Sequence, residues 1–314
     1  MQQAILCPGQ GAQHVGMGKD FFESHQAARD VYGLADEIIG FPLSALCFHG
    51  PDSQLQQTDN AQVAIFVTTV AIYETLKALG KLPAGVDVAA GLSLGEYSAL
   101  YIAGAIGLPD AIRLVRARGE LMQAAAVVQP STMLALIGAD ETQAAEICRQ
   151  AAGHGIVVMA NFNAPGQIVL SGGVEACAQA AKVAQTMGVR GVPLNVAGAF
   201  HSPFMRPAAE KMREILAGVP IVMPRIAVIS NVTARPHESV EKLRELLVEQ
   251  IVAPVRWSQS MDYLRQQGTL QYLELGPGRV LTGLMKKIDR RAPITNISSA
   301  DALATPVSVP QAGK

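Results

Sequence analysis

The stretch VDVAAGLSLGEYSALYIA, residues 86–103, sets the architecture of the whole chain. Its apolar run at 86–90 predicts a buried strand, and the helix formers at 96–103 predict a helix. Between them lies G-L-S-L-G, whose serine is Ser93. Two glycines without a Cβ let strand and helix pass close to a serine in a strained turn. The pattern predicts a nucleophile elbow, with the unpaired N–H groups of a helix start behind Ser93.

The composition indicates a well-buried globular protein without a nucleic-acid-binding surface. The 314 residues are 49% hydrophobic, and 25 basic residues are balanced by 26 acidic ones, whereas nucleic-acid-binding proteins usually carry a basic excess. Four scattered cysteines without C-x-x-C spacing argue against a metal site or a disulfide framework. We find no signal-peptide pattern and no apolar run of about 18 residues. We therefore expect a cytoplasmic protein that does not enter a membrane. We also expect a monomer, although nothing in the composition determines the oligomeric state.

Two sequence patterns alternate along the chain. Residues 1–128 and 197–300 predict an α/β-hydrolase-like core with a parallel sheet around the elbow. Residues 129–196 predict the order β-α-β-β-α-β, which is typical of a ferredoxin-like subdomain inserted into that core. A ligand cleft is expected between the two. The Ala-, Pro- and Ser-rich residues 301–314 predict a disordered tail.

Two long helices are predicted on either side of the elbow. The nearly all-apolar stretch 60–79 predicts a buried helix. A second helix, predicted at 110–125, carries Arg113, Arg116 and Arg118. Arginines on a helix are usually solvated, and we expect two of these three to be. An arginine pointing inward would need a carboxylate partner.

A serine nucleophile needs a base at neutral pH, and histidine is the usual one. Four of the six histidines stand in polar or Gly/Pro-flanked stretches that predict a surface position: His25, His49, His154 and His237. His14 follows the Gly-rich loop at 8–13, which could aim a backbone N–H into the cleft. His201 lies where the chain returns from the inserted part to the core. Chain order favours His201 over His14, and no acid at a turn completes a triad.

Seven motifs occur together in a fixed order. They are P-G-Q-G at 8–11, G-L-S-L-G-E at 91–96, R-G at 118–119, N-F-N-A-P-G-Q at 161–167, A-F-H at 199–201, Gln250, and E-L-G-P-G at 274–278. This set resembles the malonyl-CoA:acyl carrier protein transacylases, which load malonyl groups in type II fatty acid synthesis. The similarity spans about residues 4–297.

The resemblance implies a role for each catalytic position. Ser93 would carry the malonyl group, and His201 would take its proton and later activate the incoming thiol. The main-chain carbonyl of Gln250, in place of a carboxylate, would orient His201. Main-chain N–H groups of Gln10 and Leu94 would form the oxyanion hole.

The resemblance also implies the substrate-binding residues. Arg118 would bind the free carboxylate of malonate with its planar fork, and a neutral acyl group would leave the guanidinium buried and unpaired. Phe200 matches the residue found in the malonyl-selective members of the family. The bulk of its side chain would leave little room for an α-methyl group on the substrate. Met122 would line the acyl pocket, although a core methionine is the commoner explanation. Asn161 and Asn163 would lie near coenzyme A or, alternatively, cap their own loop.

The implied reaction is a ping-pong transfer from malonyl-CoA to the phosphopantetheine thiol of acyl carrier protein, without a metal or redox cofactor. An acidic carrier would dock on a local basic surface, although the same residues fit a solvated helix face. The candidates are Arg279, Lys286, Lys287, Arg290 and Arg291. Three alternatives remain: a transacylase subunit of malonate decarboxylase, a serine hydrolase, and a catalytically silent docking protein.

Overall fold

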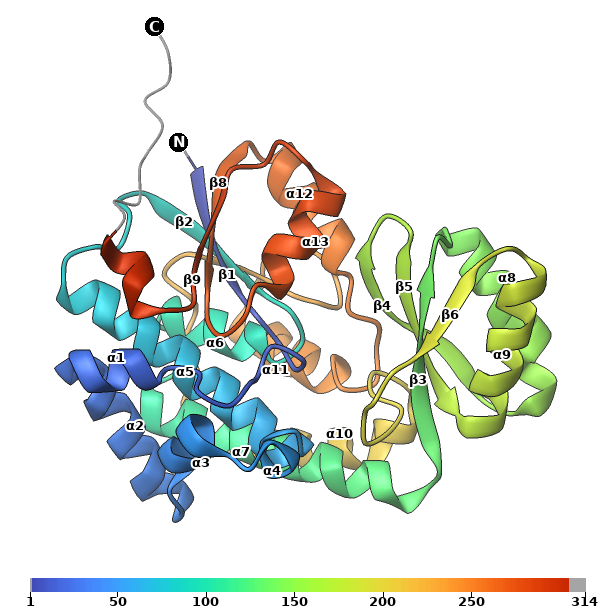
Figure 1. Cartoon of the computed structure of the whole chain (residues 1–314), viewed down its shortest axis with the longest axis horizontal. Coiled ribbons are helices and arrows are strands. Elements are labelled where there is room, and N and C mark those ends of the chain that lie inside the picture. The colour runs from blue at the N-terminus through green and yellow to red at the C-terminus, as the bar shows by residue number, and fades with distance from the viewer. Residues whose placement is uncertain (1, 305–314) are drawn as a thin grey trace, which may run out of the picture.

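A parallel five-stranded sheet lies at the centre of the larger part of the molecule (Figure 1). The computed structural model describes residues 2–304. The strand order is β7-β2-β1-β8-β9, and all neighbouring pairs are parallel. The strands are β1 (Gln2–Cys7), β2 (Val86–Gly91), β7 (Ala227–Ile229), β8 (Thr269–Leu275) and β9 (Ile294–Ile297). Because parallel strands end at one edge of a sheet, the loops that follow them meet there.

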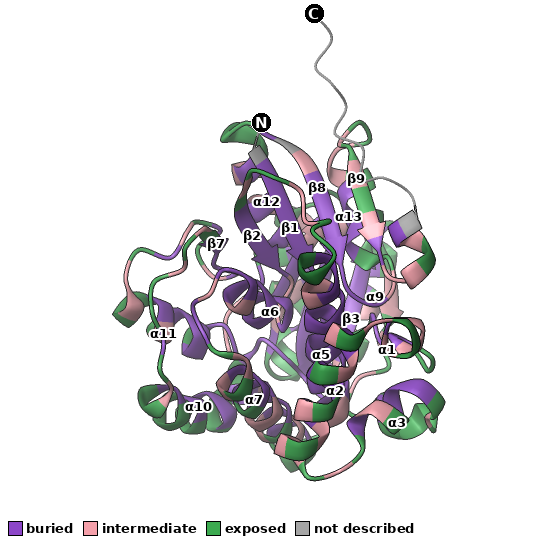
Figure 2. Cartoon of the chain, turned by 90° about the vertical axis from the view of Figure 1, so that its left-hand side faces the viewer, coloured by how far each residue is buried: buried purple, intermediate pink, exposed green. Residues whose placement is uncertain are grey.

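Helices cover both faces of this sheet, so its strands are apolar on both sides. In β1, Ile5 and Cys7 belong to one core cluster, whereas the alternating Ala4 and Leu6 belong to another. The first cluster packs under α1 (Lys19–Ser24), α2 (Gln26–Ile39), α3 (Leu43–His49), α4 (Asp52–Leu55), α5 (Thr58–Ala78), α6 (Gly95–Ile102), α7 (Leu108–Val128), α10 (Arg206–Gly218) and α11 (Val240–Glu249). The second packs under α12 (Trp257–Gln266) and α13 (Val280–Ile288). Figure 2 shows β1 and β2 in the buried colour.

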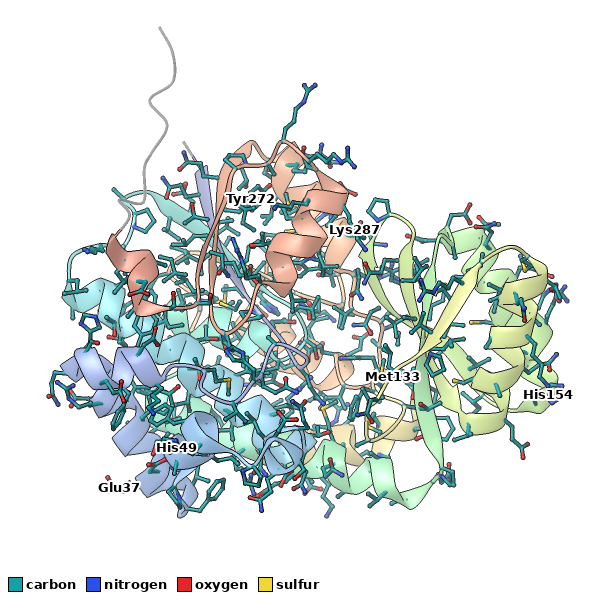
Figure 3. The ribbon with its side chains drawn as sticks, viewed as in Figure 1. Glu37, His49, Met133, His154, Tyr272 and Lys287 are labelled. Atoms are coloured by element: carbon teal, nitrogen blue, oxygen red, sulfur yellow. The ribbon has the colours of Figure 1, made fainter. Side chains whose placement is uncertain are left out.

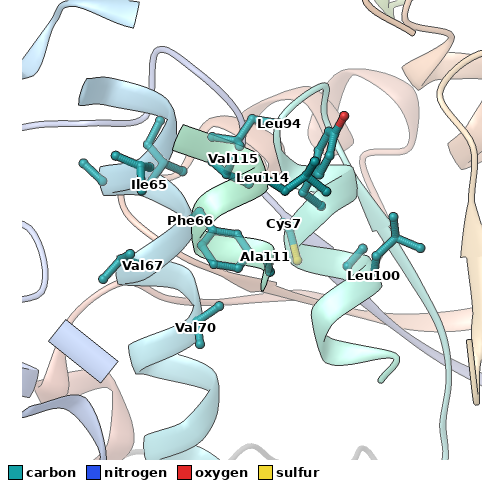
Figure 4. Packing of buried hydrophobic residues seen from close by; sticks show 14 of the residues in the cluster. Cys7, Ile65, Phe66, Val67, Val70, Leu94, Leu100, Ala111, Leu114 and Val115 are labelled. Atoms are coloured by element: carbon teal, nitrogen blue, oxygen red, sulfur yellow. The ribbon is translucent and has the colours of Figure 1, made fainter. Parts of the chain in front are cut away.

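Helix α5 is the buried helix that the stretch 60–79 predicts. Figure 4 shows its Phe66 close to Cys7 at the end of β1. α5 packs against both α2 and α7. Gly119 permits the approach to α7, because a Cβ there would lie 2.9 Å from the Cα of Asp59. This contact fixes the position of α7, which carries Arg118.

The smaller part of the molecule is a four-stranded antiparallel sheet of order β4-β5-β3-β6, with α8 and α9 on its outer face (Figure 1). Its elements are β3 (Ser131–Ile137), α8 (Glu141–Ala151), η1 (Ala152–His154), β4 (Val157–Ala164), β5 (Gln167–Gly173), α9 (Val174–Thr186) and β6 (Arg190–Pro193). Leu134 and Leu136 face the two helices, whereas the alternating Met133 and Ala135 join the core of the larger part. One face of this sheet therefore lies against the edge where the parallel strands end.

Backbone hydrogen bonds join the two parts. The N–H of Phe162, in β4, donates to the carbonyl of Val255 at 2.9 Å, and the N–H of Val255 donates to the carbonyl of Ala160 at 2.8 Å. The guanidinium carbon of Arg256 lies 5.7 Å from the centroid of the Phe162 ring, within the range of a cation–π contact. The smaller sheet is thus fixed beside the segment that precedes α12.

Several elements differ from the sequence-based expectations. None of α3, α4, α12 and β9 was predicted from the sequence. α12 carries buried residues at 257, 261 and 264, a helical spacing that follows directly on a proline-containing loop. The predicted disordered tail is wrong for 301–304, which lie in the 3₁₀ helix η3 (Ala300–Ala304). There Leu303 packs into the core and the N–H of Ala300 donates to Asp20; residues 305–314 lie outside the described residues.

No single helix among residues 2–304 is long and apolar enough to cross a membrane. Helices α2 and α3 are long and apolar enough only when taken together, and this pair is bent by 119°.

Candidate active site

The turn between β2 and α6 has the geometry of a nucleophile elbow. Ser93 adopts φ 52°, a left-handed conformation that is uncommon for residues other than glycine. A Cβ at Gly91 would lie 1.8 Å from the main-chain carbon of Gly95, and a Cβ at Gly95 would lie 2.1 Å from the carbonyl oxygen of Cys7. No larger residue fits either position. The predicted elbow is therefore confirmed.

Asn231, which follows β7, holds this turn in place. Its Oδ1 accepts a hydrogen bond from the N–H of Ser93 at 2.6 Å, and its Nδ2 donates to the carbonyl of Gly91 at 2.7 Å. Asn231 is almost fully buried. Asn231 was not among the predicted site residues, and its only local signal is its place just after the short apolar run that forms β7.

His201 is brought to Ser93 by the loop that leaves the smaller sheet. Its Nε2 lies 2.8 Å from the Oγ of Ser93, and its Nδ1 lies 2.7 Å from the main-chain oxygen of Gln250. Because a carbonyl can only accept, Nδ1 carries the proton and Nε2 is free to accept one from the serine. His201 also has a left-handed backbone, with φ 56°. The Oγ of Ser171, in β5, supports this loop by donating to the carbonyl of Phe200 at 2.6 Å.

Burial holds His201 in its neutral form. Desolvation, together with the nearby positive charge of Arg118, lowers the pKa of His201 to about 4, although backbone hydrogen bonds act in the opposite direction. An imidazole with this pKa is unprotonated at neutral pH and can act as a general base.

Arg118 is the inward-pointing arginine. It is 1% exposed, and burial lowers the pKa of its guanidinium. Nη1 donates to Oε1 of Gln62 at 2.5 Å, and Nη2 donates to Oε1 of Gln250 at 2.9 Å and to Oγ of Ser93 at 3.1 Å. The expected carboxylate partner is absent within residues 2–304, and Nε has no partner there either. The guanidinium is therefore held by neutral groups and remains able to bind an anion.

The other two arginines of α7 lie at the surface. Arg113 is exposed. Arg116 is partly buried and pairs with Glu120 at 2.6 Å and with Asp59 at 3.6 Å. The expectation that two of the three arginines face solvent thus holds fully for Arg113 and in part for Arg116.

Ser93, His201 and Arg118 line a single cavity of about 320 Å³ between the two parts of the molecule. The remaining residues predicted for the site also line it, except Gln250, whose carbonyl lies behind His201: Gln10, Leu94, Met122, Asn161, Asn163 and Phe200. Within the described residues, the main-chain N–H groups of Gln10 and Leu94 donate no hydrogen bond. The Oδ1 of Asn163 is buried without a partner in the same part of the chain.

The remaining histidines are not at the nucleophile. His14 is exposed and its Nδ1 lies 3.3 Å from the carbonyl of Ala12. Figure 3 shows His49 and His154 far from the region between the two parts. The predicted surface position of His237 is wrong: the residue is 6% exposed, and its Nε2 lies 2.9 Å from Oε1 of Glu96. Within residues 2–304 no cluster of three or more His, Cys, Asp or Glu side chains could hold a metal ion.

A parallel α/β core with a serine elbow, a neutral histidine and a buried arginine in one cavity defines a serine acyltransferase. The acyl transferase domain family matches residues 5–305 of the chain. The malonyl CoA-acyl carrier protein transacylase of Bacillus subtilis is 40% identical over 302 residues, which are 96% of this chain and 94% of that protein. The chain belongs to the acyl transferase family, among its malonyl CoA-acyl carrier protein transacylases.

Solved structures agree over nearly the whole chain. An acyl-carrier-protein S-malonyltransferase from Bartonella henselae is 39% identical and superposes with a TM-score of 0.93, covering 97% of this chain and 98% of that one. A malonyl-transacylase in complex with a type II polyketide synthase acyl-carrier protein is 36% identical, with a TM-score of 0.94 and coverages of 98% and 99%. Both parts of the molecule are therefore shared with these enzymes.

Proposed function

We propose that this protein transfers a malonyl group from malonyl-CoA to the phosphopantetheine thiol of an acyl carrier protein. One observation carries the proposal. The Oγ of Ser93 lies within hydrogen-bond distance of both the Nε2 of His201, at 2.8 Å, and the Nη2 of Arg118, at 3.1 Å. A nucleophile, its base and a cation for a carboxylate thus share one cavity.

In the first half of the reaction, Ser93 attacks the thioester carbonyl of malonyl-CoA. His201 takes the hydroxyl proton on Nε2 as the C–O bond forms, and the main-chain N–H groups of Gln10 and Leu94 bind the developing oxyanion. The C–S bond then breaks and the proton passes to the sulfur of coenzyme A. The product is a malonyl ester on Ser93.

The second half reverses these steps with a different thiol. His201 takes the proton from the phosphopantetheine thiol, whose sulfur attacks the serine ester. Collapse of the tetrahedral intermediate returns the proton to Ser93 and leaves the malonyl thioester on the carrier. Both halves conserve the oxidation state, so the chemistry requires no redox cofactor.

Arg118 supports selectivity for a dicarboxylic acyl group. Its partners are amide and hydroxyl oxygens, which orient the guanidinium without neutralising it. A malonyl carboxylate would supply the missing negative charge, whereas an acetyl group would leave a buried cation uncompensated, at a cost of roughly 3–5 kcal/mol. Met122 and Phe200, 2% and 6% exposed, would form the apolar walls of the acyl site.

The strand orders support a finer description of the fold. In the smaller part, the sheet order and the helices α8 and α9 support a ferredoxin-like subdomain at 129–196. The elbow after β2 supports an α/β-hydrolase-like core, formed by 1–128 and 197–300. The free cysteine thiols support a reducing compartment, the cytoplasm.

The segment after the E-L-G-P-G motif offers a surface for an acidic carrier. Arg279, Lys286, Lys287, Arg290 and Arg291 are all exposed. Figure 3 shows Lys287 on α13 at the side facing the smaller part, where its Nζ donates to Oε1 of Gln167 at 2.7 Å. The basic segment therefore lies next to the junction of the two parts, where the cavity is also found.

The direct test is the mass of the intact protein after mixing with malonyl-CoA. We expect a single malonyl adduct that disappears on addition of phosphopantetheinylated carrier protein, with the malonyl group recovered on the carrier. The Ser93→Ala variant should form no adduct. Release of free malonate in place of malonyl-carrier would instead indicate a hydrolase.

A further inference from the structure

The carboxylate of Glu96 is fully buried beside the active site, yet it takes no part in the reaction proposed above. Glu96 is 0% exposed and lies in the first turn of α6. Its Oε2 accepts hydrogen bonds from Nε2 of Gln250 at 2.7 Å and from the N–H of Asn231 at 3.0 Å. Its Oε1 lies 2.9 Å from Nε2 of His237. Burying a carboxylate costs several kcal/mol, so its position calls for a physical explanation.

Glu96 determines which way the side-chain amide of Gln250 points. The Nε2 of Gln250 donates both to Glu96 and to the main-chain oxygen of Ser93, at 3.0 Å, and neither group can donate in return. The Oε1 of Gln250 must therefore face the opposite way, toward Nη2 of Arg118 at 2.9 Å. If the amide were reversed, its NH₂ group would face the guanidinium and repel it.

Gln250 also separates two opposite charges. The negative charge of Glu96 favours the charged form of Arg118 and so opposes the lowering of the Arg118 pKa by burial. A direct ion pair would instead occupy the guanidinium fork. With the amide between them, Arg118 keeps electrostatic support while its face toward the cavity stays available to a carboxylate.

We propose that Glu96 is a positioning residue that selects malonyl over neutral acyl groups by fixing Gln250 and, through it, Arg118. His237, Asn231 and Ser93 complete the set of contacts that hold the Glu96–Gln250 pair. The inference rests on the proposed malonyl transfer and adds to it the residue that keeps the carboxylate-binding group oriented and charged.

The first experiment compares two acyl donors in Glu96→Gln, a change that preserves size and removes the charge. Malonyl-CoA reports on Arg118, whereas p-nitrophenyl acetate acylates Ser93 without a carboxylate. We expect kcat/KM for malonyl-CoA to fall about 10-fold or more and that for p-nitrophenyl acetate to change less than about 3-fold. Glu274→Gln is the matched control, because Glu274 is equally buried but binds no residue of the site; it should leave the ratio of the two donors unchanged.

The second experiment moves the charge. The double variant Glu96→Gln/Gln250→Glu keeps one carboxylate and places it directly on Arg118, while the main-chain carbonyl at 250 still faces His201. We expect the preference for malonyl-CoA over p-nitrophenyl acetate to fall about 100-fold or more, because the guanidinium fork is then occupied. Circular dichroism and thermal melting establish whether each variant is folded. If the double variant does not fold, the result with Glu96→Gln alone tests the proposal.

The outcomes separate the two proposals. Equal losses for both donors in Glu96→Gln would assign Glu96 a purely structural role and overturn the inference, as would an unchanged malonyl preference in either variant. Absence of a malonyl adduct in the wild-type protein would refute the proposed function itself.

Discussion

Two buried carboxylates, Glu274 and Glu96, accept hydrogen bonds from partners at very different distances along the chain. Both are 0% exposed. Glu274, near the end of β8, accepts the N–H groups of Leu281 and Thr282, both at 2.9 Å, only seven and eight residues further along the chain. The partners of Glu96 lie 135 to 154 residues away. One carboxylate caps the start of α13 and belongs to the scaffold, and the other joins distant segments at the site.

The contrast indicates that one buried carboxylate serves the stability of the fold and the other serves the selectivity of the site. A carboxylate at a helix start compensates unpaired N–H groups and the helix dipole, which stabilises α13 wherever the substrate is. In the proposed role, a carboxylate that orients Gln250 would act through Arg118 and would affect only the acyl group bound there. Substitutions around Glu274, the scaffold side, should therefore change the free energy of unfolding. Substitutions around Glu96, the site side, should change the preference between acyl donors.

The largest effect is expected on the site side, from Arg118→Ala. Loss of the guanidinium would remove the proposed partner of the malonyl carboxylate, so kcat/KM for malonyl-CoA should fall roughly 10²–10³-fold. The measurement is the rate of Ser93 acylation by malonyl-CoA and by acetyl-CoA. Arg118→Met, which keeps more of the side-chain volume, controls for packing. A variant that still preferred malonyl donors would contradict the assignment.

On the scaffold side, Glu274→Ala should lower stability without altering selectivity. The N–H groups of Leu281 and Thr282 would lose their buried acceptor, so we expect a loss of about 2–4 kcal/mol in the free energy of unfolding. Urea denaturation measures this loss. Thr282→Val, which removes only the hydroxyl donor to Glu274, should cost less, about 1 kcal/mol. A change in the malonyl-to-acetyl ratio in either variant would remove the distinction between the two carboxylates.

The same contrast explains how much the sequence could predict. The elbow follows from Gly91 and Gly95 with a strand before and a helix after, because its geometry depends on residues close together in the chain. The parallel core and the β-α-β-β-α-β order also follow from local patterns. His201 could be favoured by chain order, whereas the roles of Arg118 and Gln250 came from the resemblance of the motifs.

Contacts between residues far apart in the chain could not be predicted from these local patterns. His237 stands in a polar, proline-containing stretch that suggested a surface position, but the fold places it against Glu96, 141 residues earlier. Asn231 likewise binds the elbow across 138 residues. No local periodicity records such pairs, since they exist only once β7 has paired with β2. The neutral partners of Arg118 were missed for the same reason.

A smaller effect is expected on the pH dependence of the rate, which tests the interaction between His201 and Arg118 at the site. Because the pKa of His201 is lowered to about 4, kcat/KM for p-nitrophenyl acetate should stay nearly constant from pH 8 to about pH 5.5 and decline only as the pH approaches 4. A histidine with an ordinary pKa would already lose half its rate near pH 6.5. Arg118→Met removes a nearby positive charge, so its acid limb should move toward neutral pH. An acid limb that stayed at the same pH would exclude this electrostatic contribution.

The smallest effect is expected at the surface, where neither carboxylate acts. Reversing the charges of Lys286 and Lys287 should raise the KM for carrier protein a few-fold and leave that for malonyl-CoA unchanged, because rim charges act mainly on encounter. Lys211→Glu/Lys242→Glu, on exposed positions of α10 and α11, makes the same change in net charge elsewhere. The difference between the two double variants should shrink as ionic strength rises. Equal effects on both substrates, or equal effects of the two double variants, would discard docking at α13.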